Sequence, residues 1–156
     1  MDASIASVIA ICGTLLGSVI TYMFQRRGAE RAERFARSER LHHERLAAYS
    51  AFAGALTELR RAVTSLWFRR QSDPSGGDAV TAAQMEADRL GAVAEQARFR
   101  VQLLAVDPDL VDLADAAFKS IGAIRRAVDR TELVEQEERF HEAVTAFITG
   151  ASARVR

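Results

Sequence analysis

An uncharged stretch of twenty-two residues, Ala3 to Phe24, constrains this chain more than any other feature. A helix of that length is about 33 Å long at a rise of about 1.5 Å per residue, which is enough to cross a bilayer. Nine of its residues are Ile, Leu, Val or Phe, and each favours insertion by about 0.3–0.6 kcal/mol. The stretch therefore predicts a transmembrane anchor at residues 1–24. A buried core helix of a soluble protein is the alternative.

The charges on either side of this stretch predict its orientation. Only Asp2 precedes it, whereas Arg26, Arg27 and further arginines follow it. Arginines near a span are retained on the cytoplasmic side of the membrane. No basic segment precedes the stretch and no Ala-x-Ala site follows it, so a cleaved signal peptide is not expected. We expect a single-pass protein of the cytoplasmic membrane, with its N-terminus outside and its C-terminal domain in the cytoplasm.

Residues 25–45 are polar nearly all round and are rich in Arg and Glu. Glu30 with Arg34 and Glu33 with Arg37 are i,i+4 pairs in the favourable order, each worth a few tenths of a kcal/mol to a helix. This pattern predicts a charged helical stalk that continues directly from the span. A basic segment that binds anionic lipid is the alternative.

Beyond the stalk, apolar residues recur at helical spacing. Phe35, His42, Tyr49, Leu56 and Val63 repeat every seven residues, which suits a bundle helix or a parallel coiled coil. The repeat is joined by Leu46, Phe52, Leu59 and Leu66.

Three further helical stripes follow the first. One includes Val80, Met85, Leu90, Val93, Ala94, Ala97, Val101 and Leu104; the next includes Leu110, Leu113, Ala114, Ala117, Phe118, Ile121 and Ile124; and the last includes Leu133, Phe140, Val144, Phe147 and Ile148. Because strand-like alternation is absent, we expect an all-α fold. One N-terminal transmembrane helix is continuous with a cytosolic antiparallel four-helix bundle at residues 46–156, in which Leu56 and Phe118 are core positions.

Local signals predict where these helices begin and end. The run Asp73 to Gly77 predicts a loop, and Asp78 or Thr81, with Gln84, predicts the cap of the helix that follows. Asp107 before Pro108 predicts a helix start. Asp129 and Glu132 have capping-box spacing, and Gly150 is expected to end the last helix. The glycines inside helices, Gly54, Gly91 and Gly122, suggest close helix crossings.

Charge and cysteine content exclude several classes of protein. The formal net charge is zero. It is unevenly placed, with an excess of arginine in residues 25–72 and of acids in residues 73–118, but this asymmetry is too mild for a nucleic-acid-binding protein. The single cysteine, Cys12, lies in the predicted span and permits no disulfide within one chain, in agreement with a cytoplasmic domain. No phosphate loop, serine nucleophile motif or zinc-ligand pattern is present, so we expect no enzymatic activity and no cofactor.

Small residues form a stripe along the predicted span. Ala6, Ala10, Gly13 and Gly17 are spaced three or four apart, and the two glycines form a G-x-x-x-G motif. Such a face allows two helices to approach closely in lipid, where no hydrophobic drive brings them together. We therefore expect the span to form a homo-oligomer. The alternative is that Gly and Ala are simply common in spans.

A repeated Glu-x-x-His motif is the one pattern typical of metal binding. Glu39 with His42 and Glu138 with His141 have the spacing by which helices of ferritin-like bundles hold two metal ions. That site also needs an inward Glu from each of the other two helices, and the third helical segment offers only aspartates. Coincidence in a Glu-rich and Arg-rich chain is the alternative, and we expect no metal site.

The first seventy residues resemble a group of short actinobacterial membrane proteins, some of which are KilB-type plasmid-transfer proteins. The resemblance rests on Ser4-Ile5, on Gly13 to Gly17, on Gln25-Arg26, and on Arg60-Arg61-Ala62 followed by Trp67. It implies a role in the spread of conjugative plasmids and assigns no functional residues. Residues 71–156 carry no motif of this group.

Three hypotheses about function follow. The first is a non-enzymatic, membrane-anchored helical scaffold or adaptor, which self-associates and presents its bundle to an unknown cytosolic protein partner. The second is a membrane-tethered metal-binding bundle of the di-iron type. The third is a pore-forming lysis or toxicity protein.

Overall fold

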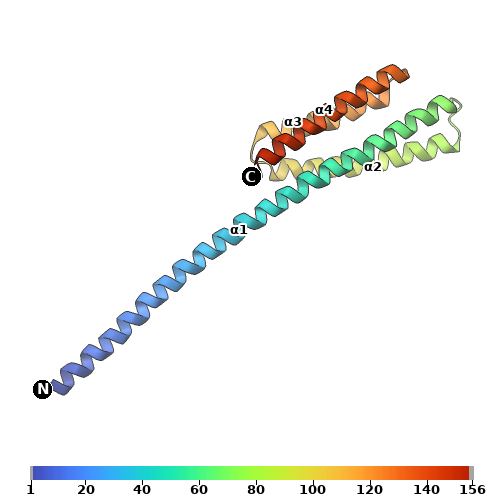
Figure 1. The fold of residues 1–156 in the computed structure, drawn as a ribbon. Coiled ribbons are helices and arrows are strands. Elements are labelled where there is room, and N and C mark those ends of the chain that lie inside the picture. The colour runs from blue at the N-terminus through green and yellow to red at the C-terminus, as the bar shows by residue number, and fades with distance from the viewer. Residues whose placement is uncertain (1, 155–156) are drawn as a thin grey trace. The chain divides into compact units, whose positions relative to one another are not determined.

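The computed structural model describes the backbone of residues 2–154 and the side chains of residues 37–154. This part of the chain contains four helices and no strand: α1 (Asp2–Ser72), α2 (Asp78–Leu104), α3 (Pro108–Arg126) and α4 (Arg130–Arg154) (Figure 1). The chain divides after Leu41 into two units, and the second unit combines the end of α1 with α2, α3 and α4. The predicted all-α class is confirmed.

The predicted span, Ala3 to Phe24, lies outside the residues whose side chains are described, as does most of the stalk at residues 25–45. Among residues 37–154, whose side chains are described, no helix is long and apolar enough to cross a membrane.

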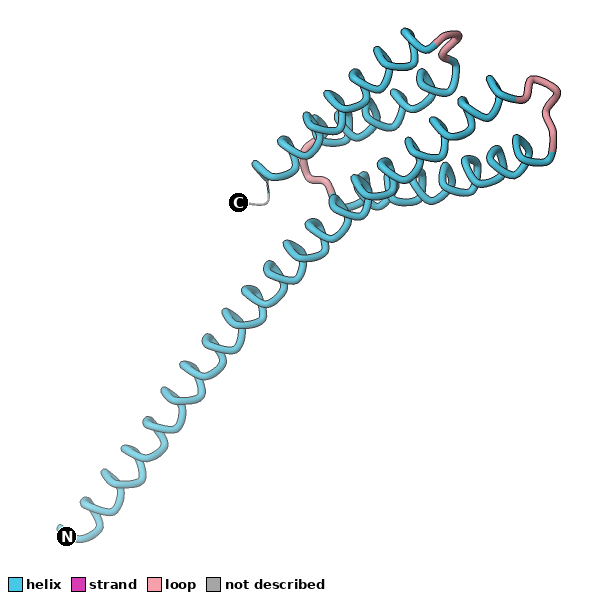
Figure 2. Tube along the Cα trace, turned by 45° about the vertical axis from the view of Figure 1, so that its right-hand side comes forward, coloured by secondary structure: helices cyan, strands magenta, loops and turns pink. Residues whose placement is uncertain are grey.

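The second unit is a helical bundle, as predicted. Short loops at residues 73–77, 105–107 and 127–129 join successive helices, which therefore run antiparallel (Figure 2). One core lies between the helices and consists of apolar side chains from all four. The described residues contribute no polar or charged residue to that core.

The end of α1 supplies large side chains to the core. Its buried positions repeat every three or four residues: Tyr49, Phe52, Leu56, Leu59, Val63 and Leu66. The ring of Phe52 lies edge-on to the ring of Phe147 of α4, with centroids 5.1 Å apart. Leu46, predicted as part of this stripe, is 49% exposed and not a core residue. His42, in the predicted stalk, is exposed as well, and the alternative of a coiled coil stays a prediction.

Helix α2 supplies small side chains to the same core. Val80, Ala87, Ala94 and Val101 are buried at intervals of seven residues. Met85 and Val93, which the sequence placed in this face, are 69% and 42% exposed. The prediction is wrong for these two because α2 has apolar residues on two faces, and only the face that carries the buried alanines and valines is covered.

The loop predicted at residues 73–77 is confirmed, but its cap differs from the prediction. The carboxylate of Asp73 accepts hydrogen bonds from the backbone N–H groups of Ser75 and Gly77, at 3.1 and 3.2 Å. Gly76 has a φ of 78°, a conformation that favours glycine. The N-cap of α2 is Gly77, which makes no side-chain cap, so neither Asp78 nor Thr81 has that role.

The starts of α3 and α4 agree with the sequence. Asp107 caps α3 by accepting a hydrogen bond from the N–H of Asp109 at 2.9 Å, and Pro108 occupies the first helical position. Asp129 accepts from the N–H of Glu132 at 2.8 Å, while Glu132 accepts from the N–H of Val128. Asp129 and Glu132 thus form a capping box in which the carboxylate of Glu132 bonds the N–H of Val128, the residue before the N-cap, and not the N–H of Asp129.

Helices α3 and α4 cross closely at Gly150, which the sequence analysis expected to end the last helix. Helix α4 continues through Gly150 to Arg154, whose Nε donates to Asp107 at 2.6 Å. A Cβ at Gly150 would lie 2.8 Å from Cδ1 of Leu113 in α3. At Gly54, Gly91 and Gly122 a Cβ would meet no other helix closer than 4.0 Å, so the crossings predicted there are wrong.

Candidate functional site

The repeated Glu-x-x-His motif does not converge in the structure. Glu39, His42, Glu138 and His141 are all exposed. Tyr49 packs on Phe147 and Arg60 binds Glu137, so α1 and α4 run antiparallel, and His141 lies level with about residue 55 of α1. At about 1.5 Å per residue, His42 is roughly 20 Å farther along the bundle axis. The described residues include no group of three His, Cys, Asp or Glu that could hold a metal ion.

The small-residue stripe of the predicted span, Ala6, Ala10, Gly13 and Gly17, lies outside the residues whose side chains are described. Its prediction as a face for helix association stays a prediction.

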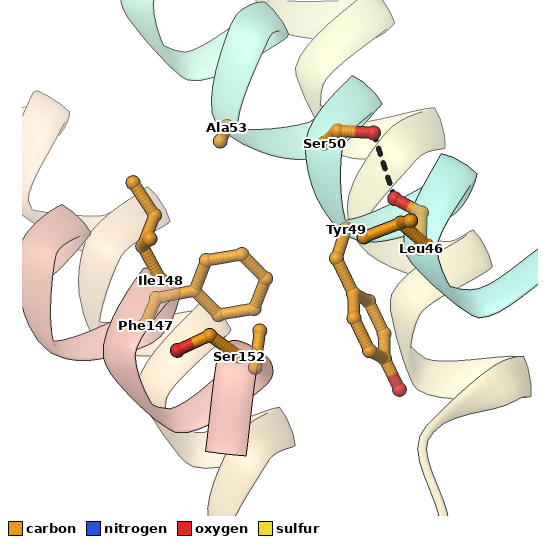
Figure 3. Close-up of a pocket in the computed structure, with 8 residues that line it drawn as sticks. Leu46, Tyr49, Ser50, Ala53, Phe147, Ile148 and Ser152 are labelled. Carbon is orange, nitrogen blue, oxygen red and sulfur yellow. Dashed lines mark hydrogen bonds between the residues drawn. The ribbon is translucent and has the colours of Figure 1, made fainter. Parts of the chain in front are cut away.

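The structure instead shows an apolar groove of about 290 Å³ between α1 and α4 (Figure 3). The groove lies near the end of the bundle where α1 enters it. Leu46 and Ile148 are 49% and 48% exposed at its sides, and the ring of Phe147 forms part of its floor. Its full lining is Leu46, Tyr49, Ser50, Ala53, Phe147, Ile148, Ala151 and Ser152.

The serine hydroxyls of this groove are already bonded to backbone carbonyls of their own helices. The hydroxyl of Ser50 donates to the carbonyl of Leu46 at 2.7 Å, one turn earlier in α1. The hydroxyl of Ser152 donates to the carbonyl of Thr149 at 2.9 Å. Neither serine has a His, Asp or Glu among the other groove residues to act as a base. The groove therefore offers a packing surface for apolar side chains rather than acid–base chemistry.

Tyr49 is the only titratable residue in the lining of the groove. Burial raises the pKa of its phenol above the ordinary value of 10.0, and the nearby Arg45 and Arg154 oppose that shift. The phenol is therefore neutral at physiological pH and contributes its ring to the packing. That ring lies edge-on to Phe147, with centroids 6.2 Å apart.

A second polar cluster joins α2 to α3. The guanidinium of Arg98 donates to Asp115 at 3.0 Å and lies 4.9 Å from the ring centre of Phe118. The side chain of Arg98 is only 16% exposed. Phe118, predicted as a core residue, is therefore half-buried beneath this cation and not inside the core. The ion pair with Asp115 joins α2 to α3, whereas the buried Nε of Arg98 has no hydrogen-bond partner among the described residues.

Sequence reasoning missed the groove because it assigned Leu46 and Ile148 to the core. Both residues follow the helical spacing of the buried stripes, so periodicity alone does not separate a core position from a position at the edge of that core. The available signal was the small size of Ser50, Ala53, Ala151 and Ser152 beside them, which leaves space between α1 and α4.

Comparison with known families and structures identifies the bundle. The family described as KilB plasmid transfer protein matches residues 46–155. No curated protein matches the chain, and no solved structure does so. The matched region begins four residues after the start of the compact second unit at His42. The resemblance seen in the sequence rested on the first seventy residues, so it overlaps this match only in the last part of α1.

Proposed function

Because the chain belongs to the KilB plasmid transfer protein family, we propose that it is a membrane-anchored, non-enzymatic helical scaffold in plasmid transfer. The uncharged stretch from Ala3 to Phe24 anchors the chain, and the arginines that follow it keep the bundle on the cytoplasmic side. The bundle is the part that the family shares, and it is presented there to a protein partner.

The observation that carries this proposal is the uncharged stretch, together with its connection to the bundle. Twenty-two residues without a charge are long enough for one span. Helix α1 runs from Asp2 to Ser72, so the helix that includes this stretch also supplies the large core residues of the bundle.

The groove between α1 and α4 supports the scaffold part of the proposal. It is apolar, its serine hydroxyls are bonded to their own helices, and its volume of about 290 Å³ can accept a few apolar side chains. An amphipathic helix that inserts apolar residues at i, i+3 and i+4 fits such a groove. We therefore assign the groove to the cytosolic protein partner.

A topology assay tests the anchor. A reporter that is active only outside the cytoplasm should be silent when it is fused after Arg156, because the arginine-rich segment holds the C-terminus inside. The chain should also stay in the membrane fraction after alkaline extraction. Strong reporter activity, or release by alkali, would contradict the proposal.

Self-association through the span is tested separately. Replacing Gly13 and Gly17 with Ile should abolish the dimer signal in a two-hybrid assay for membrane helices, because the bulky side chains keep the two backbones apart. Replacing Leu15 and Leu16 with Ile should leave the signal in place. Equal signals from both variants would show that the small-residue face is not the contact.

The role of the groove is tested by plasmid transfer. Leu46→Glu and Ile148→Glu place a charge at the sides of the groove, and both positions are about half exposed, so the bundle should stay folded. We expect transfer frequency to fall at least tenfold. Val134→Glu is the matched control, since Val134 is 53% exposed on α4 and does not line the groove. If Val134→Glu lowers transfer by the same factor, the groove is not the surface that plasmid transfer requires.

A further inference from the structure

The groove between α1 and α4 contains one polar group that the bundle itself does not use. Tyr49 is only 5% exposed, yet its hydroxyl makes no hydrogen bond within the part of the chain whose side chains are described. Figure 3 shows the ring of Tyr49 across the groove from that of Phe147, with the hydroxyl on the side away from Ser50 and Ala53. The groove therefore has an unused O–H donor beside its apolar lining.

Two cations lie close to this hydroxyl. Arg45 precedes Tyr49 by one turn of α1, and Arg154 follows Ser152 of the groove lining by two residues. Both guanidinium groups act to lower the pKa of the phenol, against the larger effect of burial. The hydroxyl of Tyr49 therefore lies in a positive field, which favours an anion as its partner.

Only one of the two cations is already neutralised. The Nε of Arg154 donates to the carboxylate of Asp107 at 2.6 Å. The Nε of Arg45 instead donates to the backbone carbonyl of Leu104 at 3.0 Å, and Arg45 has no ion pair within residues 37–154. That bond to a neutral carbonyl holds the guanidinium in place and leaves its charge without a counterion. A fixed cation beside an unused phenolic O–H is a site that suits a carboxylate.

We propose that Tyr49 and Arg45 together bind a carboxylate of the protein partner that occupies the groove. This inference rests on the proposed function, because it names the chemistry of that partner. The partner is an amphipathic helix that inserts apolar residues between Leu46 and Ile148 and carries an Asp or Glu one turn away from them. The phenol donates a hydrogen bond to the carboxylate, and the guanidinium supplies the opposite charge.

The same two groups discriminate against other side chains at that position of the partner. A Lys or Arg there would bring a second cation next to Arg45, which is unfavourable. An Asn or Gln would accept the hydrogen bond from Tyr49 but would leave the charge of Arg45 uncompensated. The apolar part of the groove thus supplies contact area, and its polar end supplies specificity for an acidic residue.

A selection from a library of helical peptides tests the proposal on the full chain in lipid nanodiscs. The probe is a phage-displayed amphipathic helix with leucines at i, i+3, i+4 and i+7 and with its polar positions randomised. We expect the natural chain to enrich helices over the Leu46→Glu chain, with Asp or Glu one turn from the leucines. A chain with both Tyr49→Phe and Arg45→Gln should enrich helices without this acidic preference.

The possible results separate this inference from the proposed function. Enrichment of helices by the natural chain without an acidic preference would overturn the carboxylate site alone and leave the groove as a site for a helix. No enrichment over the Leu46→Glu chain would contradict the assignment of the groove to a helical partner, and this inference would fail with it.

Fluorescence anisotropy of one selected acidic peptide gives a second measurement. Tyr49→Phe keeps the ring and should weaken binding about fivefold, because one hydrogen bond is lost. Arg45→Gln should weaken it about tenfold, because a charged partner is lost. Arg100→Gln is the matched control, since Arg100 is exposed on α2 and does not line the groove, and it should leave the affinity unchanged.

The same peptide with its acidic residue replaced by the amide distinguishes recognition from a merely structural role of Tyr49. It should bind the natural chain and the Tyr49→Phe chain equally well. If Tyr49→Phe weakens the acidic and the amide peptides by the same factor, the proposal is wrong.

A fatty acid is the other source of a carboxylate on an apolar body. Octanoate at the same concentration as the labelled peptide should not displace it, because octanoate fills less of the groove. Displacement by equimolar octanoate that Tyr49→Phe abolishes would assign the site to a fatty acid and overturn the protein partner.

Discussion

The end of α1 and helix α2 follow the same seven-residue period but use it differently. Helix α1 buries Phe52, Leu56 and Leu66, which are among the largest fully buried side chains of the bundle. Helix α2 buries two alanines and two valines and leaves Met85, Phe99 and Leu103 in solvent. Both helices pack against the same core. The difference therefore lies in the size of the side chains that each helix buries there.

This difference shows that period alone does not identify a core face. A helix with one apolar stripe has only one way to face its neighbours, whereas α2 has two stripes about 200° apart. The alanine-rich stripe fits the narrow space left by the large residues of α1 and α4, since a packed interior fills volume as well as burying area. The other stripe, which carries Met85, Phe99 and Leu103, stays exposed.

The largest expected effect on stability comes from opening a cavity between α1 and α4. Phe147→Ala removes a fully buried ring that contacts both Phe52 and Tyr49, and we expect it to lower the free energy of unfolding by about 3–5 kcal/mol. Urea unfolding of the full chain, followed by fluorescence, measures this. Trp67 is the only tryptophan and is buried with its indole N–H bonded to the carbonyl of Ala127, so its fluorescence reports the bundle.

Met85→Ala is the matched control on the outer face of α2, and it should change the free energy of unfolding by less than about 0.5 kcal/mol. If Met85→Ala costs as much as Phe147→Ala, the assignment of the two faces of α2 is wrong.

A smaller effect is expected from enlarging the alanine seam of α2. Ala94 is fully buried, so Ala94→Leu should overpack the core and cost about 1–3 kcal/mol in the same unfolding measurement. Ala92→Leu adds the same side chain two residues earlier, on the exposed stripe, and should change the free energy of unfolding little. Equal costs at the two positions would remove the distinction between the inner and outer stripes.

Two helix glycines should respond in different ways to the same substitution. Gly54→Ala meets no atom within 4 Å, so it should stabilise the bundle by about 0.5–1 kcal/mol through its higher helix propensity. Gly150→Ala places a Cβ 2.8 Å from Leu113, so Leu113 must move and the gain should be absent. An equal gain at both positions would show that α3 and α4 do not cross closely at Gly150.

The smallest expected effect is the acid sensitivity of the polar contact between α3 and α4. The hydrogen bond from Arg154, followed by that from the N–H of Asp109, lowers the pKa of Asp107 below its ordinary value of 3.8. A lowered folded-state pKa stabilises the protein above the unfolded value, and this stabilisation is lost as the pH falls through the folded value. Arg154→Met should therefore reduce stability slightly at neutral pH, and its difference from the natural chain should shrink below about pH 4. A difference that stays constant on acidification would contradict this account.

Much of the fold was predictable because its signals are local. The Asp107-Pro108 start depends on one carboxylate and one fixed φ angle, and the Asp129 with Glu132 cap depends on residues three apart. The candidate site was not predictable in the same way. The groove depends on the space left between α1 and α4, and that space is a property of two helices about one hundred residues apart in the chain.

The sequence by itself determined that the chain is all-α, where its loops lie, and that Leu56 and Phe147 belong to the core, because each of these follows from short-range spacing and side-chain polarity. The sequence also showed a resemblance to KilB-type proteins in its first seventy residues, while the family match lies in residues 46–155. Only the tertiary structure decided which stripe of α2 is buried, that Gly150 and not Gly54 lies at a helix crossing, and that the two Glu-x-x-His motifs stay apart. The physical reason is that period and polarity are properties of one helix, whereas volume, crossing distance and convergence arise only when several helices share one core.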